Sequence, residues 1–345
     1  MNGKLFFRFF IFALIIVLAG MLVGKLMKKK SRIDTISRSI PVMSTVLEIK
    51  LYGDPKRLAS AADAAAKEIE RIEKVFSIFG EGEATKINES AGKKPFKCSD
   101  EMWDILKKSE EFHKLSGRAF DVSIRPMMLL WGFYRKRDQF PSDKEIEETL
   151  AKIGFEKIIL NEKDKSIFFS NPDMSLDFGG IVKGYAVDRA VAKIESLGVR
   201  SGLVNLGGNI RVLPEPPPGK KHYDIGIRHP KMKDDICGVA RISGGRALAT
   251  SGNYERYIIL KDKHITHIIN PSNGRPVEKM ISVTVITSDA ISADAMSTSV
   301  FVGGETLARK IVSDRPGTEF LIIMSDSDGK TRIIKIGESW SNILL

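Results

Sequence analysis

Asp294 and Thr298 are the residues whose types and spacing point most directly to metal chemistry. They lie in the stretch Ser292-Ala-Asp-Ala-Met-Ser-Thr298, which follows a strand-like run over residues 281–287 and begins a helix-like run. Side chains four apart on a helix share one face, and both offer oxygen, the ligand that Mg²⁺ prefers. An aspartate in the first helical turn is also favoured without a metal, so the spacing alone leaves both interpretations open.

A glycine-rich stretch from Leu176 to Asp188 could bind a phosphate. It holds a Gly-Gly pair and a Lys-Gly pair at the start of a helix-like run over residues 183–197. Glycines let the backbone approach a phosphate, the helix N-terminus supplies N–H donors, and Lys183 supplies a point charge. The stretch matches neither the Walker loop nor the G-x-G-x-x-G fingerprint. A tight turn capping the helix, with Lys183 solvated, is an equally weighted alternative.

Two further features suit a ring ligand and a proton transfer. Residues 120–133 are rich in aromatic side chains and are broken by Pro126 and Gly132, a composition that suits a flat ring, although core packing is the more common role of such side chains. His267 is one of five histidines and precedes a Pro/Gly turn at 270–274. Functional residues concentrate in such positions, but a lone histidine is more often structural.

Hydrophobic periodicity and capping signals predict the elements that must position these residues. Helices are expected over residues 55–79, from Ser99 to Leu115, after a Ser142/Glu145 capping box, and over 183–197, 290–302 and 305–313. Strands are expected over residues 41–52, 203–206, 223–228, 254–260, 264–269, 281–287, 319–324 and 331–336. Helices and strands mix without regular βαβ alternation, which favours an α+β fold.

The charge of the chain argues against nucleic acid as a partner. The chain has 345 residues and a net charge of +11, of which residues 1–40 contribute +7 from eight basic residues and one acidic residue. A nucleic-acid footprint needs basic residues clustered on the folded domain, and no recognised binding module is present. The two cysteines, Cys98 and Cys237, lie in unrelated contexts, so we expect unpaired thiols rather than a metal site or a disulfide.

The N-terminus reads as a membrane-targeting segment. Residues 9–24 carry no charge and are flanked by Lys4 and Arg8 on one side and by Lys25 and residues 28–30 on the other. The run is slightly short for a span of about 20 residues. Without a good cleavage site, an uncleaved anchor is favoured over a signal peptide. The basic cluster after the run favours a cytoplasmic domain, whereas the N-terminal charges resemble an export signal.

Seven motifs, taken in order, resemble the ApbE-type FAD:protein FMN transferase family. They are Met43-Ser-Thr45 with Ser77…Asn88, Phe120-Asp121…Pro126…Leu130-Trp-Gly132, Leu176–Asp188, Asn205-Leu-Gly-Gly208, Ala249-Thr-Ser-Gly252, His267-Ile-Ile-Asn-Pro271 and Ala293-Asp294…Thr298. The resemblance implies an α+β fold with a single large domain and a central mixed sheet flanked by helices. The division is then a membrane anchor or signal segment at 1–30, a linker at 31–40 and a flavin transferase domain at 41–345.

The resemblance also implies the activity. Such an enzyme uses Mg²⁺ to transfer FMN from FAD to a Thr or Ser hydroxyl of a target protein, with release of AMP. The target is expected to be a subunit of a membrane redox complex. We therefore expect an enzyme anchored in the inner (cytoplasmic) membrane with its catalytic domain on the extracytoplasmic, periplasmic side.

By position, the resemblance assigns roles to individual residues. The metal ligands would be Gly180 through its carbonyl, Asp294 and Thr298. His267 would be the base for the target hydroxyl. The residues expected to contact FAD are Met43, Phe79, Leu130, Trp131, Gly132, Asp177, Lys183 and Ile268.

Three departures from the family pattern bear on activity. Ser44 stands where glycine is usual, Phe79 where tyrosine is common, and Asn270-Pro-Ser-Asn-Gly274 replaces Asp-Pro-x-Thr-Gly. The lost carboxylate and hydroxyl groups would weaken metal or FAD binding. Three alternatives therefore stay open: an FAD pyrophosphatase that releases FMN and AMP, a non-catalytic FAD carrier, and a membrane-tethered interaction domain, which the ordered glycine-rich motifs disfavour.

Overall fold

The computed structural model describes residues 34–232, 235–326 and 328–345. The predicted membrane segment at 1–30, and residues 31–33 of the predicted linker, lie outside the described residues. Within the described ranges, no helix combines the length and the apolar composition needed to cross a bilayer.

One eight-stranded sheet forms the centre of the molecule, in the order β1-β2-β6-β7-β10-β15-β16-β17. Its strands are β1 (Asp34–Val42), β2 (Thr45–Gly53), β6 (Ser201–Leu206), β7 (Asn209–Val212), β10 (Ala247–Gly252), β15 (Met280–Thr287), β16 (Glu319–Ser325) and β17 (Thr331–Ile336). Every neighbouring pair is antiparallel. The α+β class is confirmed, but the expectation of a mixed sheet is wrong for these strands. Some neighbours, such as β6 and β7, are joined as a hairpin by a short turn at Gly207-Gly208, whereas others, such as β15 and β16, are antiparallel although α8 lies between them in the chain.

The first hairpin corrects two further predictions. Residues 34–40, expected in a polar linker, form most of β1, and Ile36 and Ile40 pack against the core. The expected strand at 41–52 is interrupted by a two-residue turn at Met43 and Ser44, with φ of 52° and 56°. The isoleucines of β1 are separated by polar residues, so the strand signal was weak in the sequence.

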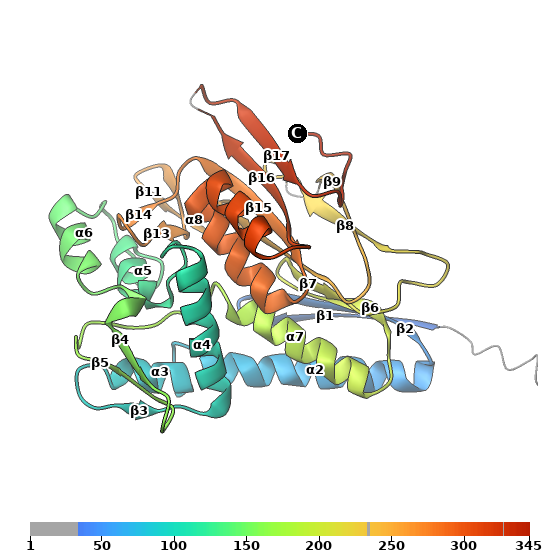
Figure 1. Ribbon diagram of the computed structural model, residues 1–345, viewed down its shortest axis with the longest axis horizontal. Helices are drawn as coiled ribbons and strands as arrows, with labels where there is room; N and C mark the ends of the chain where they lie inside the picture. The colour runs from blue at the N-terminus through green and yellow to red at the C-terminus, as the bar shows by residue number, and fades with distance from the viewer. Residues whose placement is uncertain (1–33, 233–234, 327) are drawn as a thin grey trace, which may run out of the picture.

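Helices cover one face of the sheet and a small sheet covers the other. On the first face lie α2 (Pro55–Phe76), α7 (Val182–Ser196) and α8 (Ala290–Asp314), with α2 and α7 side by side (Figure 1). They enclose the main core with sheet residues such as Leu47 and Val283. On the other face, β8 (Tyr223–Arg228), β9 (Ile236–Ile242) and β18 (Trp340–Ser341) pack against residues such as Leu248 and Ile286.

The predicted helices are confirmed near their capping signals. Ser99 caps α4 (Asp100–Leu115), the capping box of Ser142 and Glu145 begins α6 (Asp143–Leu150), and Gly198 follows α7 with a positive φ. The two helices expected at 290–302 and 305–313 are both present. They meet at Gly304, whose φ of 71° and ψ of −164° are not helical, and together they carry the label α8.

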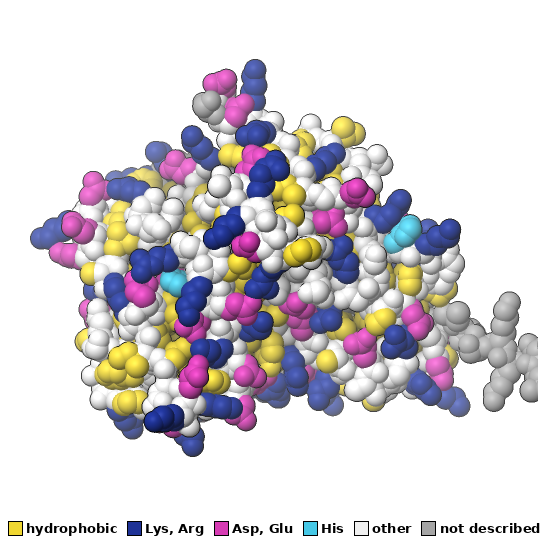
Figure 2. Space-filling model, viewed as in Figure 1, with side chains coloured by type: hydrophobic (Ala, Val, Ile, Leu, Met, Phe, Trp, Pro, Cys, Tyr) yellow, Lys and Arg dark blue, Asp and Glu magenta, His cyan; other side chains and the backbone are white. Residues whose placement is uncertain are grey.

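The remaining elements surround one end of the sheet. They are α3 (Glu83–Glu89), α5 (Arg125–Trp131), η1 (Val122–Ile124), η2 (Phe155–Lys157), β3 (Phe96–Lys97), β4 (Ile158–Asn161), β5 (Ser166–Phe169), β11 (Tyr257–Leu260), β12 (Lys263–Thr266), β13 (Ile269–Asn270) and β14 (Arg275–Pro276). Cys98 and Cys237 are free and buried, as expected. Lys and Arg are interspersed with Asp and Glu over the face of the molecule shown in Figure 2.

Candidate functional site

Asp294 and Thr298 lie on the first half of α8, which Asp289 caps by accepting a hydrogen bond from the Ser292 N–H at 2.9 Å. Asp294 is only 4% exposed, whereas Thr298 is half-buried. The hydroxyl of Ser251, on β10, lies 3.4 Å from Thr298 Oγ1. The predicted pair therefore shares a helix face directed at the sheet, where the Ser251 hydroxyl joins the Asp294 carboxylate and the Thr298 hydroxyl.

The glycine-rich turn before α7 reaches the same place. A Cβ added to Gly180 would lie 3.4 Å from Thr298 Oγ1 and 3.2 Å from the Phe120 ring. The backbone of Gly180 therefore lies beside the Thr298 side chain, and a Cβ at this position would be in tight contact with Phe120 and Thr298. Packing of α7 against α8 thus brings Gly180, the expected third metal ligand, close to the α8 residues Asp294 and Thr298.

Lys183 supplies positive charge to this cluster. Its Nζ donates to the carbonyl oxygen of Gly179 at 2.7 Å and lies 3.6 Å from Asp294 Oδ1. Asp294 Oδ2 accepts the N–H of Gly184 at 2.9 Å. Burial raises the pKa of Asp294, against the opposing effects of Lys183 and of this N–H. A bound cation would favour the charged carboxylate.

His267 follows β12 and is held in one orientation. Its Nδ1 lies 2.9 Å from the carbonyl oxygen of Arg256, which can only accept, so Nδ1 carries the proton and Nε2 keeps its lone pair. Burial, with a further contribution from the charge of Lys183, lowers the pKa of the half-buried His267 to about 4. The imidazole is therefore neutral at pH 7, the form that accepts a proton.

Asp177 lies at one end of the cluster and is bound by Tyr134, a residue that the sequence analysis did not single out. The Tyr134 hydroxyl donates to Asp177, whose other oxygen accepts the Gly179 N–H at 2.8 Å. The Tyr134 ring meets the edge of Phe79 at 5.4 Å between centroids. On the same ring lies the guanidinium of Arg256, 5.1 Å from the centroid. Phe79 is 58% exposed, so this aromatic cluster faces solvent.

The other residues expected near FAD have different surroundings. Met43, in the β1–β2 turn, donates its N–H to Glu73 at 2.8 Å. Trp131 is buried, and its indole N–H donates to the carbonyl oxygen of Gly274 at 2.7 Å. Leu130 and Gly132 flank it and are half-buried, and Ile268 is buried beside His267. The buried Trp131 ties α5 to the turn behind His267; its contact with a ligand stays a prediction.

The departure at 270–274 preserves a well-formed turn. Asn270 Oδ1 accepts the Ser272 N–H at 2.9 Å, and Asn273 Oδ1 accepts the Arg275 N–H at 2.9 Å. Gly274 closes the turn with φ of 67°. The asparagine oxygens thus fill the local accepting role that a carboxylate and a threonine hydroxyl would fill.

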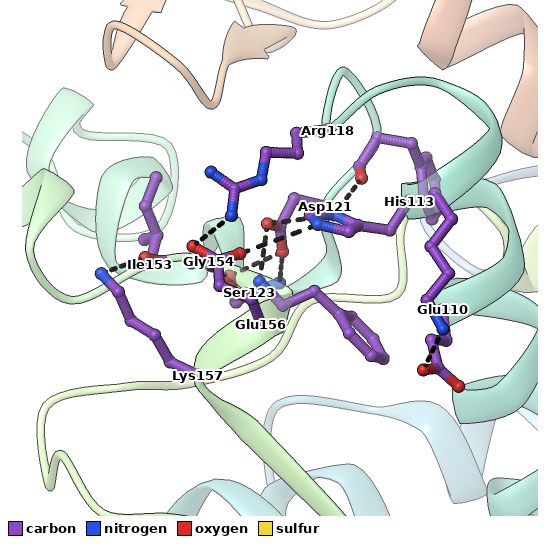
Figure 3. A network of polar contacts seen from close by, with 12 residues as sticks. Glu110, His113, Arg118, Asp121, Ser123, Ile153, Gly154, Glu156 and Lys157 are labelled. Carbon is purple, nitrogen blue, oxygen red and sulfur yellow. Dashed lines mark hydrogen bonds and ion pairs between the residues drawn. The ribbon is translucent and has the colours of Figure 1, made fainter.

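A polar network around His113 supports the Phe120 side of the site (Figure 3). His113, Asp121 and Glu156 lie close enough to hold a metal. However, His113 Nδ1 lies 3.0 Å from the carbonyl oxygen of Phe120, and Asp121 accepts N–H groups from Ser123 and Phe155. These groups already have partners, so the network fixes the loop that packs Phe120 against Gly180.

A cleft of about 350 Å³ lies next to this loop. It runs between residues 116–119, the turn at Asn270 and the α8 residues Val302 and Gly303, with Lys310 at its border. The side-chain oxygens of Asp294, Thr298 and Ser251 form what we call the oxygen cluster. Val302 is one helical turn beyond Thr298, so the cleft lies next to this cluster along α8.

Sequence reasoning missed four residues of the site: Tyr134, Asn209, Ser251 and Arg256. Ser251 lies within the motif Ala249–Gly252 and Asn209 directly follows the motif Asn205–Gly208, so the motifs were the available signal for both residues. Tyr134 and Arg256 carried no local signal, because their roles come from contacts between distant segments.

A model of the ApbE family matches residues 43–322 of the chain. Among curated relatives, an FAD:protein FMN transferase of Klebsiella pneumoniae (strain 342) is 28% identical over 293 residues, covering 85% of this chain and 90% of the relative. The FAD:protein FMN transferase of Escherichia coli (strain K12) is 28% identical over 300 residues, covering 82% and 85% of the two chains.

Solved structures share the fold. The ApbE protein of Thermotoga maritima superposes with a TM-score of 0.78 and 31% identity, covering 87% of this chain and 96% of that one. The flavin transferase ApbE of Vibrio cholerae gives a TM-score of 0.76 at 24% identity, covering 88% and 98%, and supports the fold alone.

Proposed function

The chain belongs to the ApbE family and is an FAD:protein FMN transferase, and we propose that it transfers FMN to a Thr or Ser hydroxyl of a target protein in a Mg²⁺-dependent reaction that releases AMP. The observation that carries the proposal is one continuous set of contacts. It runs from Asp177 through Gly179 and Lys183 to Asp294, with Gly180 beside Thr298.

The residues present fit a magnesium ion. Asp294 offers a carboxylate, Thr298 a hydroxyl and Gly180 a backbone carbonyl, and all three are the hard oxygen donors that Mg²⁺ prefers. When bound, Mg²⁺ neutralises the charge of the FAD pyrophosphate and polarises the attacked phosphorus. Lys183 and the N-terminus of α7 add positive charge beside it.

We propose that His267 removes the proton of the target hydroxyl. In the proposed step the hydroxyl oxygen bonds to the phosphorus of the FMN half, the bond from that phosphorus to the bridging oxygen of the pyrophosphate breaks, and AMP leaves with that oxygen. The hydroxyl proton passes to His267 Nε2 and then to solvent. The neutral imidazole and the Nδ1 bond to Arg256 supply the base in the required tautomer.

We propose that FAD extends from the oxygen cluster toward both neighbouring features. Asp177, Tyr134 and Phe79 provide a carboxylate and an exposed aromatic edge on one side. The cleft along α8 offers room on the other side. Met43, Leu130–Gly132 and Ile268 keep their proposed positions near the cofactor.

We also propose that the apolar run at residues 9–24 anchors the enzyme in the inner membrane, with the catalytic domain outside the cytoplasm and a redox-complex subunit as target. The support is the sequence alone. A C-terminal fusion to an alkaline phosphatase that is active only outside the cytoplasm tests the orientation, and an inactive fusion that is present at normal levels contradicts it.

The central experiment incubates the protein with FAD and Mg²⁺, with and without a target peptide bearing a threonine, and follows AMP release and peptide mass. AMP with an FMN-sized mass gain supports transfer. AMP with free FMN and no adduct supports the pyrophosphatase instead, and retained FAD without AMP supports a carrier. Asp294→Ala should abolish product, whereas Asp314→Ala, at the exposed end of α8, should not.

A further inference from the structure

Asn209, the first residue of β7, has an unusual environment. Its side chain is only 2% exposed, and its Oδ1 has no hydrogen-bond partner among the residues that the structure describes. Its Nδ2 lies 3.5 Å from the carbonyl oxygen of Leu206, a long contact. The amide is thus fully removed from solvent while its acceptor is unused.

An unused buried acceptor has a cost and calls for an explanation. An unpaired buried polar group is unfavourable, and native structures usually supply a water or an ion where the protein offers no partner. Two other buried side-chain atoms within the described ranges lack partners, Arg125 Nε and Arg211 Nε, and both are donors. Of these three unpaired atoms, Asn209 Oδ1 is therefore the one that can accept a hydrogen bond. A water bound to a metal needs such an acceptor for its O–H group.

The neighbour of Asn209 is the metal-site carboxylate. Asn209 pairs with Ala249 on β10, two residues before Ser251, whose hydroxyl lies 3.4 Å from Thr298 Oγ1. From this position the Asn209 side chain contributes to keeping Asp294 in its charged form, against the effect of burial, which raises the pKa of that carboxyl. Asp294 is otherwise held by the Gly184 N–H at 2.9 Å and approached by Lys183 at 3.6 Å. The unpaired Oδ1 of Asn209 therefore belongs to a side chain next to the proposed metal-binding carboxylate.

Arg211, two residues further along β7, makes a contact that is purely structural and serves as a comparison for Asn209. Arg211 pairs with Asp188 on α7 at 2.6 Å. Asp188 in turn accepts the N–H groups of Ala290 and Ile291 at the start of α8, each at 2.9 Å. This pair already links the sheet to both helices, so Asn209 is not needed for that link.

We propose that Asn209 is a positioning residue of the metal site: its NH₂ group orients the Asp294 carboxylate, and its Oδ1 accepts a hydrogen bond from a water bound to the metal. The inference rests on the proposed function, because it requires a cation at Asp294. Mg²⁺ keeps several of its waters when it binds to proteins, and partners behind the ligands typically change metal affinity by about 10–100-fold.

The test measures Mg²⁺ binding to the full chain by calorimetry, and the thermal midpoint with and without Mg²⁺. Asn209→Leu, of similar size, should weaken Mg²⁺ binding by about 10–100-fold. Its midpoint without Mg²⁺ should change little, because removal of an unpaired buried acceptor offsets the lost contact between the NH₂ group and Asp294. A merely structural Asn209 predicts a changed midpoint with unchanged Mg²⁺ affinity.

Two further variants keep the proposal testable if Asn209→Leu does not fold. Asn209→Asp places a second carboxylate beside Asp294, so the midpoint without Mg²⁺ should fall and the rise on adding Mg²⁺ should exceed that of the wild type. Arg211→Met, the matched control on β7, should lower the midpoint but leave Mg²⁺ affinity unchanged.

The outcomes separate this inference from the function on which it rests. A wild-type protein that binds no Mg²⁺, alone or with FAD, would overturn the proposed metal site and this inference with it. Wild-type binding that Asn209→Leu and Asn209→Asp both leave unchanged would overturn this inference alone. Weakened binding in the first variant, with the Arg211→Met control normal, would establish it.

Discussion

Lys183 Nζ lies 3.6 Å from Asp294 Oδ1, so the buried carboxylate of the proposed metal site already has a cation beside it. The same ammonium donates to the Gly179 carbonyl at the turn before α7. One side chain thus connects the glycine-rich turn to α8. It stabilises the charged carboxylate before a metal arrives, and it stands where a phosphate would meet both the helix N-terminus and the metal.

Lys183→Met should weaken FAD binding by about 10-fold or more, because a hydrogen bond to a charged group contributes about 1.5–3 kcal/mol. A fluorescence titration of FAD in the presence of Mg²⁺ measures the effect. Lys193→Met, in the exposed last turn of the same helix, is the control and should bind FAD normally. Equal FAD affinity in both variants would remove Lys183 from the proposed phosphate site.

Tyr134→Phe should raise the KM for FAD severalfold while changing kcat little. The substitution keeps the ring against Phe79 and Arg256 but releases the Asp177 carboxylate, a hydrogen bond to a charged group worth about 1.5–3 kcal/mol. Steady-state transfer kinetics with varied FAD measure the change.

Tyr185→Phe is the matched control for Tyr134→Phe. It removes a hydroxyl that donates to Glu101 at 2.7 Å, on the outer side of α7, and should leave the KM for FAD unchanged. A lower KM in Tyr134→Phe would contradict the positioning role and mean that the tyrosine obstructs Asp177.

Local signals explain how much of the fold the sequence predicted. The starts of α4 and α6 and the end of α7 were predicted within one or two residues. Ser99, Ser142 and Gly198 each determine the conformation of the adjacent helical turn, so their signal is local. β7 and β10 were missed because they are short and contain Gly, Ala, Ser or Asn. β1 was missed because only Ile36 and Ile40 mark its inner face.

The site residues that belong to sequence motifs were predictable, and those that reach the site through contacts between distant segments were not. Gly180, Asp294 and Thr298 were identified by the motif order, and the structure brings them together. The contact of Tyr134 with Asp177 joins residues 43 positions apart, and no local pattern predicts it. The direction in which His267 presents Nε2 depends on the Arg256 carbonyl, a backbone group that side-chain patterns do not report.

Ser44→Gly should stabilise the protein by about 0.5–1 kcal/mol. Ser44 has φ of 56° in the β1–β2 turn, and a left-handed conformation costs an ordinary residue about 1–2 kcal/mol, part of which the greater freedom of glycine in the unfolded chain offsets. Urea unfolding should show a higher midpoint with an unchanged slope. Ser44→Ala keeps the strain and should not gain stability; a gain as large as that of glycine would show that the turn is not strained.

The pH dependence of transfer tests His267 as the base. Burial and Lys183 lower the pKa of His267 to about 4, so the ring stays neutral in the free enzyme above pH 5 and is protonated only in more acidic solution. Protonation occupies Nε2 and removes the base, so activity is lost as the pH falls through this value. The kcat/KM for transfer to a peptide, measured at saturating Mg²⁺, should therefore be flat from pH 5.5 to 8. An inflection near 6.5, the ordinary value for histidine, would contradict the assignment.

His267→Gln should lower kcat by about 10²–10⁴-fold with FAD binding retained, because general-base catalysis contributes about that factor. His264→Gln, three residues earlier on exposed β12, should leave both the rate and its pH profile unchanged.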